Sequence, residues 1–314
     1  MKILIAYDGS EHADVALEEL HRAGLHDVDA IVLSVSELWL LKSEMIEKAV
    51  ADRFRTAVDE HCERAVNRGH ETATRGADRL KQKFPHWHIE AVGAAGSAVD
   101  TIICKAESWS ADLVVVGPHA HPTFLHPLPG SVSLGVLTHA PCSVRIMRAA
   151  SNHEDDGAPR LIVAIDGSHG AQAAIEMVKS RLWPSGTHVY VLMVVDTRLI
   201  PVVVPGLEIG PTSECWAEEI VARAVDELRD SGFTASASIE RGDPRILICK
   251  AAESWRADCI FLGSLGLSYL PWMRLGSIAT AVSIRAHCSV EVVRPGACDV
   301  VSQPIHPAET KPNK

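Results

Sequence analysis

Three glycines near the end of the chain have the spacing of a loop that could bind an anion. Gly263 and Gly266 follow the apolar run Cys259–Leu262, and Gly276 and Ser277 come after nine further residues. A loop that leaves a buried strand and enters a helix can direct several backbone N–H groups at phosphate oxygens. Glycine permits a close backbone approach or a positive φ angle because it has no Cβ atom. The spacing therefore makes nucleotide binding the leading hypothesis.

Two charged side chains belong to the same predicted site. Asp166 directly follows the apolar run 161–165, so we expect its carboxylate at the sheet edge, where it can accept a hydrogen bond from a ribose hydroxyl or an adenine amine. Arg274 is the only basic residue between Gly263 and Ser277, and it could offset phosphate charge. An Asp-Gly-Ser turn by itself can equally be a simple helix cap. The stronger signal is that three separate segments would converge on one edge.

The chain contains two copies of one sequence pattern. Residues 107–112 match residues 253–258 at an offset of 146 (253 − 107), and this offset holds without a gap to the end of each copy. Residues 3–10 match residues 161–168 at an offset of 158 (161 − 3). We therefore predict two domains, at residues 1–150 and 158–296, and a flexible tail at residues 297–314.

Each copy alternates apolar strand-like runs with amphipathic helices. In the second copy we expect strands at residues 161–165, 189–195, 235–239, 259–262 and 289–293. Helices between them are predicted from apolar residues at helical spacing, which are Ile175, Val178 and Leu182, and then Val221, Ala224, Val225 and Leu228. Such strands indicate an α/β fold with a parallel, doubly wound sheet that has helices on both faces. Sheets of this kind bind ligands at the carboxyl ends of their strands.

Composition excludes several classes of protein. A formal net charge of −10 argues against a nucleic-acid-binding surface. No apolar run approaches the roughly 20 residues of a membrane-spanning helix. The eight cysteines include no CxxC pair and do not have the pattern of a disulfide framework. We expect a cytoplasmic protein that binds neither nucleic acid nor membranes.

Motifs for catalysis and for metal binding are missing from the sequence. There is no P-loop, dinucleotide fingerprint, catalytic triad or HExxH signature, so we assign no catalytic residue. His119, His121 and His126 fit no metal-ligand spacing, and no nearby Cys, Asp or Glu completes a site, so we assign no metal site either. Cys142 and Cys288 precede the last strand of each copy, which suggests buried packing.

The pattern Gly263-x2-Gly266-x9-Gly276-Ser277, with Asp166 on the first strand, resembles the ATP-binding type of universal stress protein. The resemblance covers nearly the whole chain. It implies two tandem domains of the adenine nucleotide alpha hydrolase-like fold, each with a five-stranded parallel sheet. It also implies bound ATP, with any Mg or Mn carried by the phosphates. The ATP-contacting residues would be Ala164, Ile165, Asp166, Val194, Gly263, Ser264, Leu265, Gly266, Arg274, Gly276, Ser277 and Ile278.

The first copy departs from this pattern. Its loop reads Gly117-Pro118-His119-Ala120, then nine residues, then Gly130-Ser131, so that alanine replaces the second glycine. If that position needs a positive φ, alanine costs about 1–2 kcal/mol. Prolines at four positions of the loop each remove a backbone donor. The degenerate site would consist of Asp8, Gly117, Ala120, Gly130 and Ser131, and we expect it to bind ATP weakly or not at all.

Pairing of domains through their last strands follows from both the resemblance and the need to protect sheet edges. Residues 143–148 would pair with residues 289–294 inside one chain, and whole chains could pair again as homodimers. We predict a tandem universal stress protein that binds ATP mainly in its second domain and acts as a nucleotide-dependent stress-response regulator. Two alternatives stay open. One is a slow ATPase or nucleotidyl-transferring enzyme at the same pocket, and the other is a nucleotide-free dimerisation or interaction module.

Overall fold

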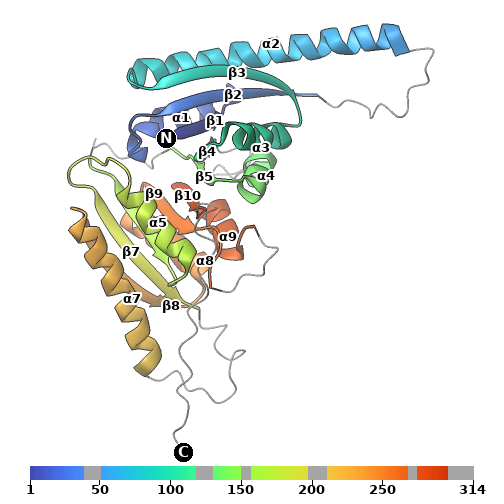
Figure 1. The fold of residues 1–314 in the computed structure, drawn as a ribbon. Helices are drawn as coiled ribbons and strands as arrows, with labels where there is room; N and C mark the ends of the chain where they lie inside the picture. Colours follow the sequence, from blue (N-terminus) through green and yellow to red (C-terminus); the bar gives the residue numbers. More distant parts are fainter. Residues whose placement is uncertain (39–50, 118–129, 150–156, 197–210, 268–273, 296–314) are drawn as a thin grey trace, which may run out of the picture.

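A computed structural model describes residues 1–38, 51–117, 130–149, 157–196, 211–267 and 274–295, with the backbone alone at residues 51–57 and 211–214. Their strands form one ten-stranded sheet in the order β3-β2-β1-β4-β5-β10-β9-β6-β7-β8 (Figure 1). Neighbouring strands are parallel except at the centre, where β5 and β10 are antiparallel. Each half therefore contributes a five-stranded parallel sheet, as expected.

The first domain runs from β1 to β5. Its elements are β1 (Lys2–Ala6), α1 (Glu11–Glu18), the 3-10 helix η1 (Glu19–Ala23), β2 (Asp29–Glu37), α2 (Ala51–Lys83), β3 (His88–Gly96), α3 (Ala98–Trp109), β4 (Leu113–Val116), α4 (Ser131–His139) and β5 (Ser143–Ile146). The second domain repeats this order with β6 (Arg160–Ile165), α5 (His169–Lys179), β7 (His188–Val195), α7 (Pro211–Asp230), β8 (Thr234–Arg241), α8 (Pro244–Trp255), β9 (Cys259–Gly263), α9 (Ser277–Arg285) and β10 (Ser289–Val293).

The five strands expected in the second copy are all present, with ends that differ by at most two residues. The helical residues expected in α7 are buried, as are Ile175 and Val178 of α5. Leu182 was wrongly placed on the same helix, because α5 ends at Lys179 and the Leu182 side chain is 65% exposed. The backbone N–H of Leu182 instead donates to the carbonyl oxygen of Gly24 (3.1 Å), so this residue belongs to the junction with the first domain.

Helices cover both faces of the sheet, and the two faces have different cores. On one face, α3, α4, α8 and α9 pack over a single apolar cluster that runs through both domains and includes Ile102, Val136, Ile248 and Val282. On the other face, α1 and α2 cover one cluster and α5 and α7 cover a separate one. The continuous cluster and the continuous sheet join the domains into one body. In the described part of the chain, no helix has the length and apolar character needed to cross a membrane.

The predicted packing role of the cysteines before the last strands agrees with their burial. Cys288 is buried and Cys142 is half-buried. Burial raises the pKa of the Cys142 thiol to about 11 and that of Cys259 to about 12, and it raises the pKa of Cys288 as well. These thiols are therefore protonated at neutral pH, which disfavours nucleophilic or redox reactivity.

Candidate functional site

The predicted site residues of the second domain come together where β6 and β9 end side by side. This is the switch point of the domain, because the chain continues from β6 to β7 on one side and from β9 to β10 on the other. Asp166 follows β6, and Gly263 is the last residue of β9. One Asp166 oxygen, Oδ1, accepts a hydrogen bond from Ser168 N (2.9 Å), and Oδ2 accepts one from Leu267 N (3.1 Å). The carboxylate thus holds the glycine loop against the turn that starts α5.

The glycines of this loop are required by close approach, and not by backbone angle. Among the described glycines, positive φ angles occur at other positions, so that explanation is wrong for Gly263 and Gly266. A Cβ atom on Gly263 would lie 2.5 Å from the carbonyl carbon of Gly170, and one on Gly266 would lie 2.5 Å from Asp166 Oδ2. At Gly276 the nearest atom, Ser264 O, would be 3.3 Å away. The argument that alanine at position 120 costs energy through φ loses its basis, and Ala120 itself lies outside the described residues.

Gly170 is a site residue that the sequence analysis missed. It lies in the first turn of α5, and a Cβ atom there would come within 2.5 Å of Leu265 O. Because neither Gly170 nor Gly263 has a side chain, the first turn of α5 packs backbone against backbone on the glycine loop. A glycine inside a helix costs about 1 kcal/mol relative to alanine, which is a signal that could have identified it. The first copy has His12 at the equivalent position (170 − 158).

Backbone donors of the loop fall into two groups. Ser264 N donates to Val293 O (2.8 Å) and Gly276 N donates to Ser264 O (2.7 Å), so these two amides shape the loop itself. In this conformation the Gly276 N–H is used within the loop, and the contribution of Gly276 to ligand binding stays a prediction. Helix α9 starts at Ser277 with Gly276 as its N-cap, which supplies no side-chain acceptor. The N–H groups of Ser277, Ile278 and Ala279 have no acceptor among the described residues, whereas Thr280 N donates to Gly276 O (3.0 Å).

The other predicted residues lie on β6, β7, α9 and the end of the glycine loop. Ala164 and Ile165 are buried at the end of β6, and Val194 and Ile278 are half-buried on β7 and α9. Arg274 is exposed at the end of the loop. The strand end, the loop and the helix start thus offer a carboxylate, open N–H groups and the Ser277 hydroxyl, which is a combination that can bind an anionic ligand with hydroxyl groups.

The first domain has only part of this arrangement. Asp8 is exposed, and its Oδ1 accepts from Ser10 N (3.0 Å), as in the second domain. Gly130 is again an N-cap without a side-chain acceptor, and Ser131 starts α4. Among the described residues, a Cβ atom on Gly117 would meet only Ala13 Cα, at 3.8 Å, so within that part of the chain there is no counterpart to the contact between Gly263 and Gly170. The loop itself, with its prolines and the histidines 119, 121 and 126, lies outside the described residues.

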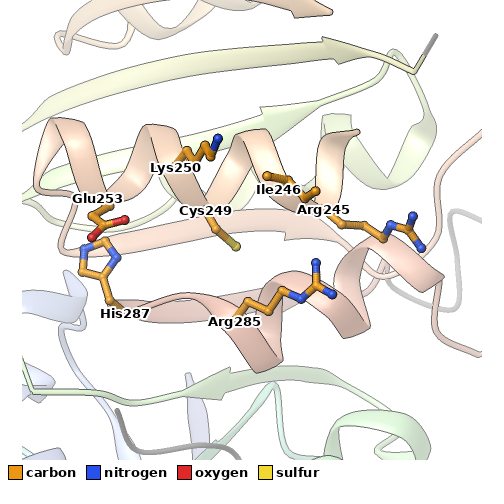
Figure 2. A pocket seen from close by; sticks show the side chains of 7 residues that line it. All are labelled: Arg245, Ile246, Cys249, Lys250, Glu253, Arg285 and His287. Atoms are coloured by element: carbon orange, nitrogen blue, oxygen red, sulfur yellow. The ribbon is translucent and has the colours of Figure 1, made fainter. Parts of the chain in front are cut away.

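A cavity of about 260 Å³ lies between α8 and α9, apart from the glycine loop (Figure 2). Its lining residues are Arg245, Ile246, Cys249, Lys250, Glu253, Arg285 and His287, none of which belongs to the predicted site. Cys249 points from α8 toward α9 (Figure 2), and burial raises the pKa of its thiol, an effect that Arg285 and Arg148 partly oppose. Within the described ranges, no three His, Cys, Asp or Glu side chains are grouped so that they could hold a metal ion.

Comparisons with known proteins match the same two halves. Residues 1–148 and residues 158–294 each match the universal stress protein family. A universal stress protein of Mycolicibacterium smegmatis is 24% identical over 306 residues, which are 93% of this chain and 97% of that protein. One from Mycobacterium tuberculosis is 29% identical over 143 residues, which are 43% of this chain and 47% of that protein.

Solved structures show the same fold. The crystal structure of a universal stress protein from Archaeoglobus fulgidus superposes with a TM-score of 0.62 at 23% identity, and the match covers 95% of this chain and 97% of that one. A putative universal stress protein from Pseudomonas aeruginosa gives a TM-score of 0.60 at 15% identity and covers 94% of this chain and 93% of that one. Both matches extend over the two domains together, so the tandem arrangement is shared as well as the fold of each half.

Proposed function

Because the chain belongs to the universal stress protein family, with one such domain in each half, we propose that it binds ATP in its second domain and acts as a nucleotide-dependent regulator of a stress response. The observation that carries the proposal is the start of α9. The N–H groups of residues 277–279 lack acceptors among the described residues, and Gly276, the N-cap of this helix, is bonded through its own N–H to Ser264 O of the glycine loop (2.7 Å). Such a helix start is an anion site.

The second domain fits an adenine nucleotide on three counts. The missing side chains at Gly263 and Gly266 let the loop pack directly against Gly170 and Asp166, which fixes the path of the loop beside the start of α9. The Ser277 hydroxyl and the α9 amides would contact phosphate oxygens, and Arg274 would offset their charge. A bound triphosphate supplies negative charge and can carry Mg or Mn. The buried ends of β6 and β7, with Ala164 and Val194, would contact the base.

Asp166 would serve the loop and the ligand together. Each of its oxygens already accepts one backbone hydrogen bond. A carboxylate oxygen offers two lone pairs, so both retain capacity for a ribose hydroxyl. This double role makes Asp166 more important for binding than a surface carboxylate, because its loss would release the glycine loop and remove a contact to the ligand.

We propose that the first domain is a degenerate copy. Position 264, whose N–H donates to Val293 O, corresponds to Pro118 in the first copy, and proline has no N–H. Within the described residues, a Cβ atom on Gly117 would meet nothing nearer than Ala13 Cα at 3.8 Å, in contrast to the 2.5 Å between a Gly263 Cβ and Gly170. ATP would then occupy one site per chain.

Isothermal titration calorimetry with ATP is expected to give one site per chain. In a thermal unfolding experiment, ATP at about 100 times its Kd should stabilise the protein by about 2.7 kcal/mol.

Asp166→Ala should weaken ATP binding at least about tenfold, because a hydrogen bond to a charged group contributes about 1.5–3 kcal/mol. The matched variant Asp8→Ala should bind as the wild type does.

Two equivalent sites per chain, or equal losses in the two variants, would contradict the assignment to the second domain. An unchanged melting temperature at saturating ATP would instead favour the interaction-module alternative. Parallel titrations with ADP and AMP would show how much of the affinity comes from the terminal phosphates.

A further inference from the structure

The seam between β5 and β10 has an almost two-fold symmetric set of contacts. Arg148 of the first domain donates to Ser283 O of the second (2.6 Å), and Arg294 of the second donates to Leu137 O of the first (2.7 Å). Each partner differs from its equivalent by 146 in number (294 − 148 and 283 − 137). These contacts would therefore form equally well if either domain paired with a second copy of itself.

The centre of the seam breaks this symmetry. Arg145 lies directly opposite Glu291 in the antiparallel ladder, between apolar pairs on either side. The two positions are equivalent in the repeat (291 − 145 = 146), so one domain has a cation where the other has an anion. Both side chains are buried, with exposed fractions of 2% for Arg145 and 0% for Glu291. A buried charge of this kind is tolerated only when it is paired.

The second domain supplies the charge partners at this point. Arg145 Nη1 lies 3.0 Å from Glu291 Oε2, and the Arg145 guanidinium lies over the ring of Phe261 at 5.9 Å. Arg181, which follows α5 in the second domain, bonds both oxygens of Glu291 and also donates to Ala23 O of the first domain (3.0 Å). Glu291 thus has an arginine from its own domain as well as one from the other.

The consequences for pairing of like domains are unequal. Two second domains joined through β10 would place Glu291 opposite Glu291, but each would bring its own Arg181. Two first domains joined through β5 would place Arg145 opposite Arg145, with no carboxylate at the central position. Like charges directly opposite each other destabilise a sheet, and burial increases the cost.

We propose that Arg145 makes β5 an edge that accepts only a strand with a central acidic residue, so that the first domain docks on the second domain and not on another copy of itself. An assembly of chains in which every last strand is paired with a like strand would need contacts between β5 strands as well as between β10 strands. Excluding contacts between β5 strands leaves those edges unpaired and so disfavours the assembly. This inference concerns the seam alone and does not depend on nucleotide binding.

The test compares the full-length wild type with Arg145→Met and Arg145→Lys after refolding from urea. Refolding is done at about 1 µM and at about 1 mM, the latter near the effective concentration that a short linker gives to joined domains. The mass distribution is then measured by size-exclusion chromatography with light scattering. Arg145→Met leaves the Arg181–Glu291 pair in place but removes the charge that prevents β5 from pairing with β5.

At the low concentration all three proteins should refold as the same species. At the high concentration Arg145→Met should contain a severalfold larger oligomer fraction than the wild type, while Arg145→Lys, which keeps the charge, should match the wild type. Equal oligomer fractions in all three proteins would overturn the proposal. So would oligomers of Arg145→Lys at the level of Arg145→Met, since size would then matter and charge would not. Failure of Arg145→Met to refold at low concentration would also overturn it, because the seam would then need Arg145 for its own stability.

Discussion

Gly263→Val is expected to abolish measurable ATP binding and to lower the free energy of unfolding by about 3 kcal/mol, the upper part of the range for overpacked sites. The Cβ atom would lie 2.5 Å from the backbone of Gly170, and backbone atoms cannot move away by changing a rotamer. Either the start of α5 or the glycine loop must shift. Both carry the hydrogen bonds of Asp166, so the shift also separates the groups that would contact the nucleotide.

Gly117→Val is the matched control for this prediction. It makes the same chemical change at the equivalent position of the first domain, where the new Cβ atom would meet Ala13 Cα at 3.8 Å, an ordinary contact distance. We expect a smaller loss of stability and unchanged ATP binding. Urea denaturation gives the free energies, and calorimetry well below the midpoint of unfolding gives the affinities. If both variants bind ATP like the wild type, the glycine loop of the second domain is not the binding site.

Gly266 should respond differently from Gly263, because the atom its Cβ would meet is the end of a side chain. Asp166 Oδ2, at 2.5 Å, can rotate away from a methyl group, although its hydrogen bond to Leu267 N is then lost. We therefore expect a side chain at position 266 to cost the hydrogen bond between Leu267 N and Asp166 but to leave the fold intact. The two glycines of the motif thus have different physical roles, which their spacing alone does not reveal.

The strands were predictable because they depend on local patterns of apolar residues. The strand expected at residues 289–293 is β10 itself, and the pairing expected between the last strands of the two domains is present in the sheet. Leu182 fits the apolar spacing of α5 but lies past its end, since the chain there bonds to Gly24 of the first domain. Helical periodicity contains no information about such a long-range contact.

The site was only partly predictable for a related reason. Spacing identified Gly263 and Gly266 as places where a side chain is excluded, but the groups that exclude it come from β6 and α5, about a hundred residues earlier. Gly170 was missed because a glycine in a helical segment has no motif around it. The use of Gly276 N inside the loop depends on the path of the loop, which residue types do not specify.

The buried charges of the seam could not be recognised from the sequence, although their positions could. The offset of 146 aligns Arg145 with Glu291, but a charged residue in a short apolar strand usually faces solvent. Only antiparallel pairing at this register places the two opposite each other, and only the chain after α5 brings Arg181 to the same carboxylate. Three residues that are distant in sequence thus form one electrostatic unit.

Glu291→Gln is expected to lower the free energy of unfolding by about 3–5 kcal/mol, the cost of breaking a buried ion pair by removing one partner. The variant keeps the shape of the side chain but leaves Arg145 and Arg181 as two buried cations that share no counter-ion. The substitution should weaken mainly the pairing of the two domains, because Glu291 lies on β10 and one of its partners, Arg145, lies on β5 of the other domain. Urea denaturation followed by tryptophan fluorescence measures the change.

Arg145→Met provides the comparison that separates charge balance from the number of contacts. It also breaks an ion pair of the seam, but Arg181 still neutralises Glu291 through both carboxylate oxygens. We expect it to cost less than about 1.5 kcal/mol, as for a hydrophobic replacement of similar volume. Equal losses in Glu291→Gln and Arg145→Met would contradict this account, because they would show that Arg181 alone does not balance the charge of Glu291. A much larger loss in Glu291→Gln would identify Glu291 as the one residue on which both buried arginines depend, since a single carboxylate then serves the edge of each domain.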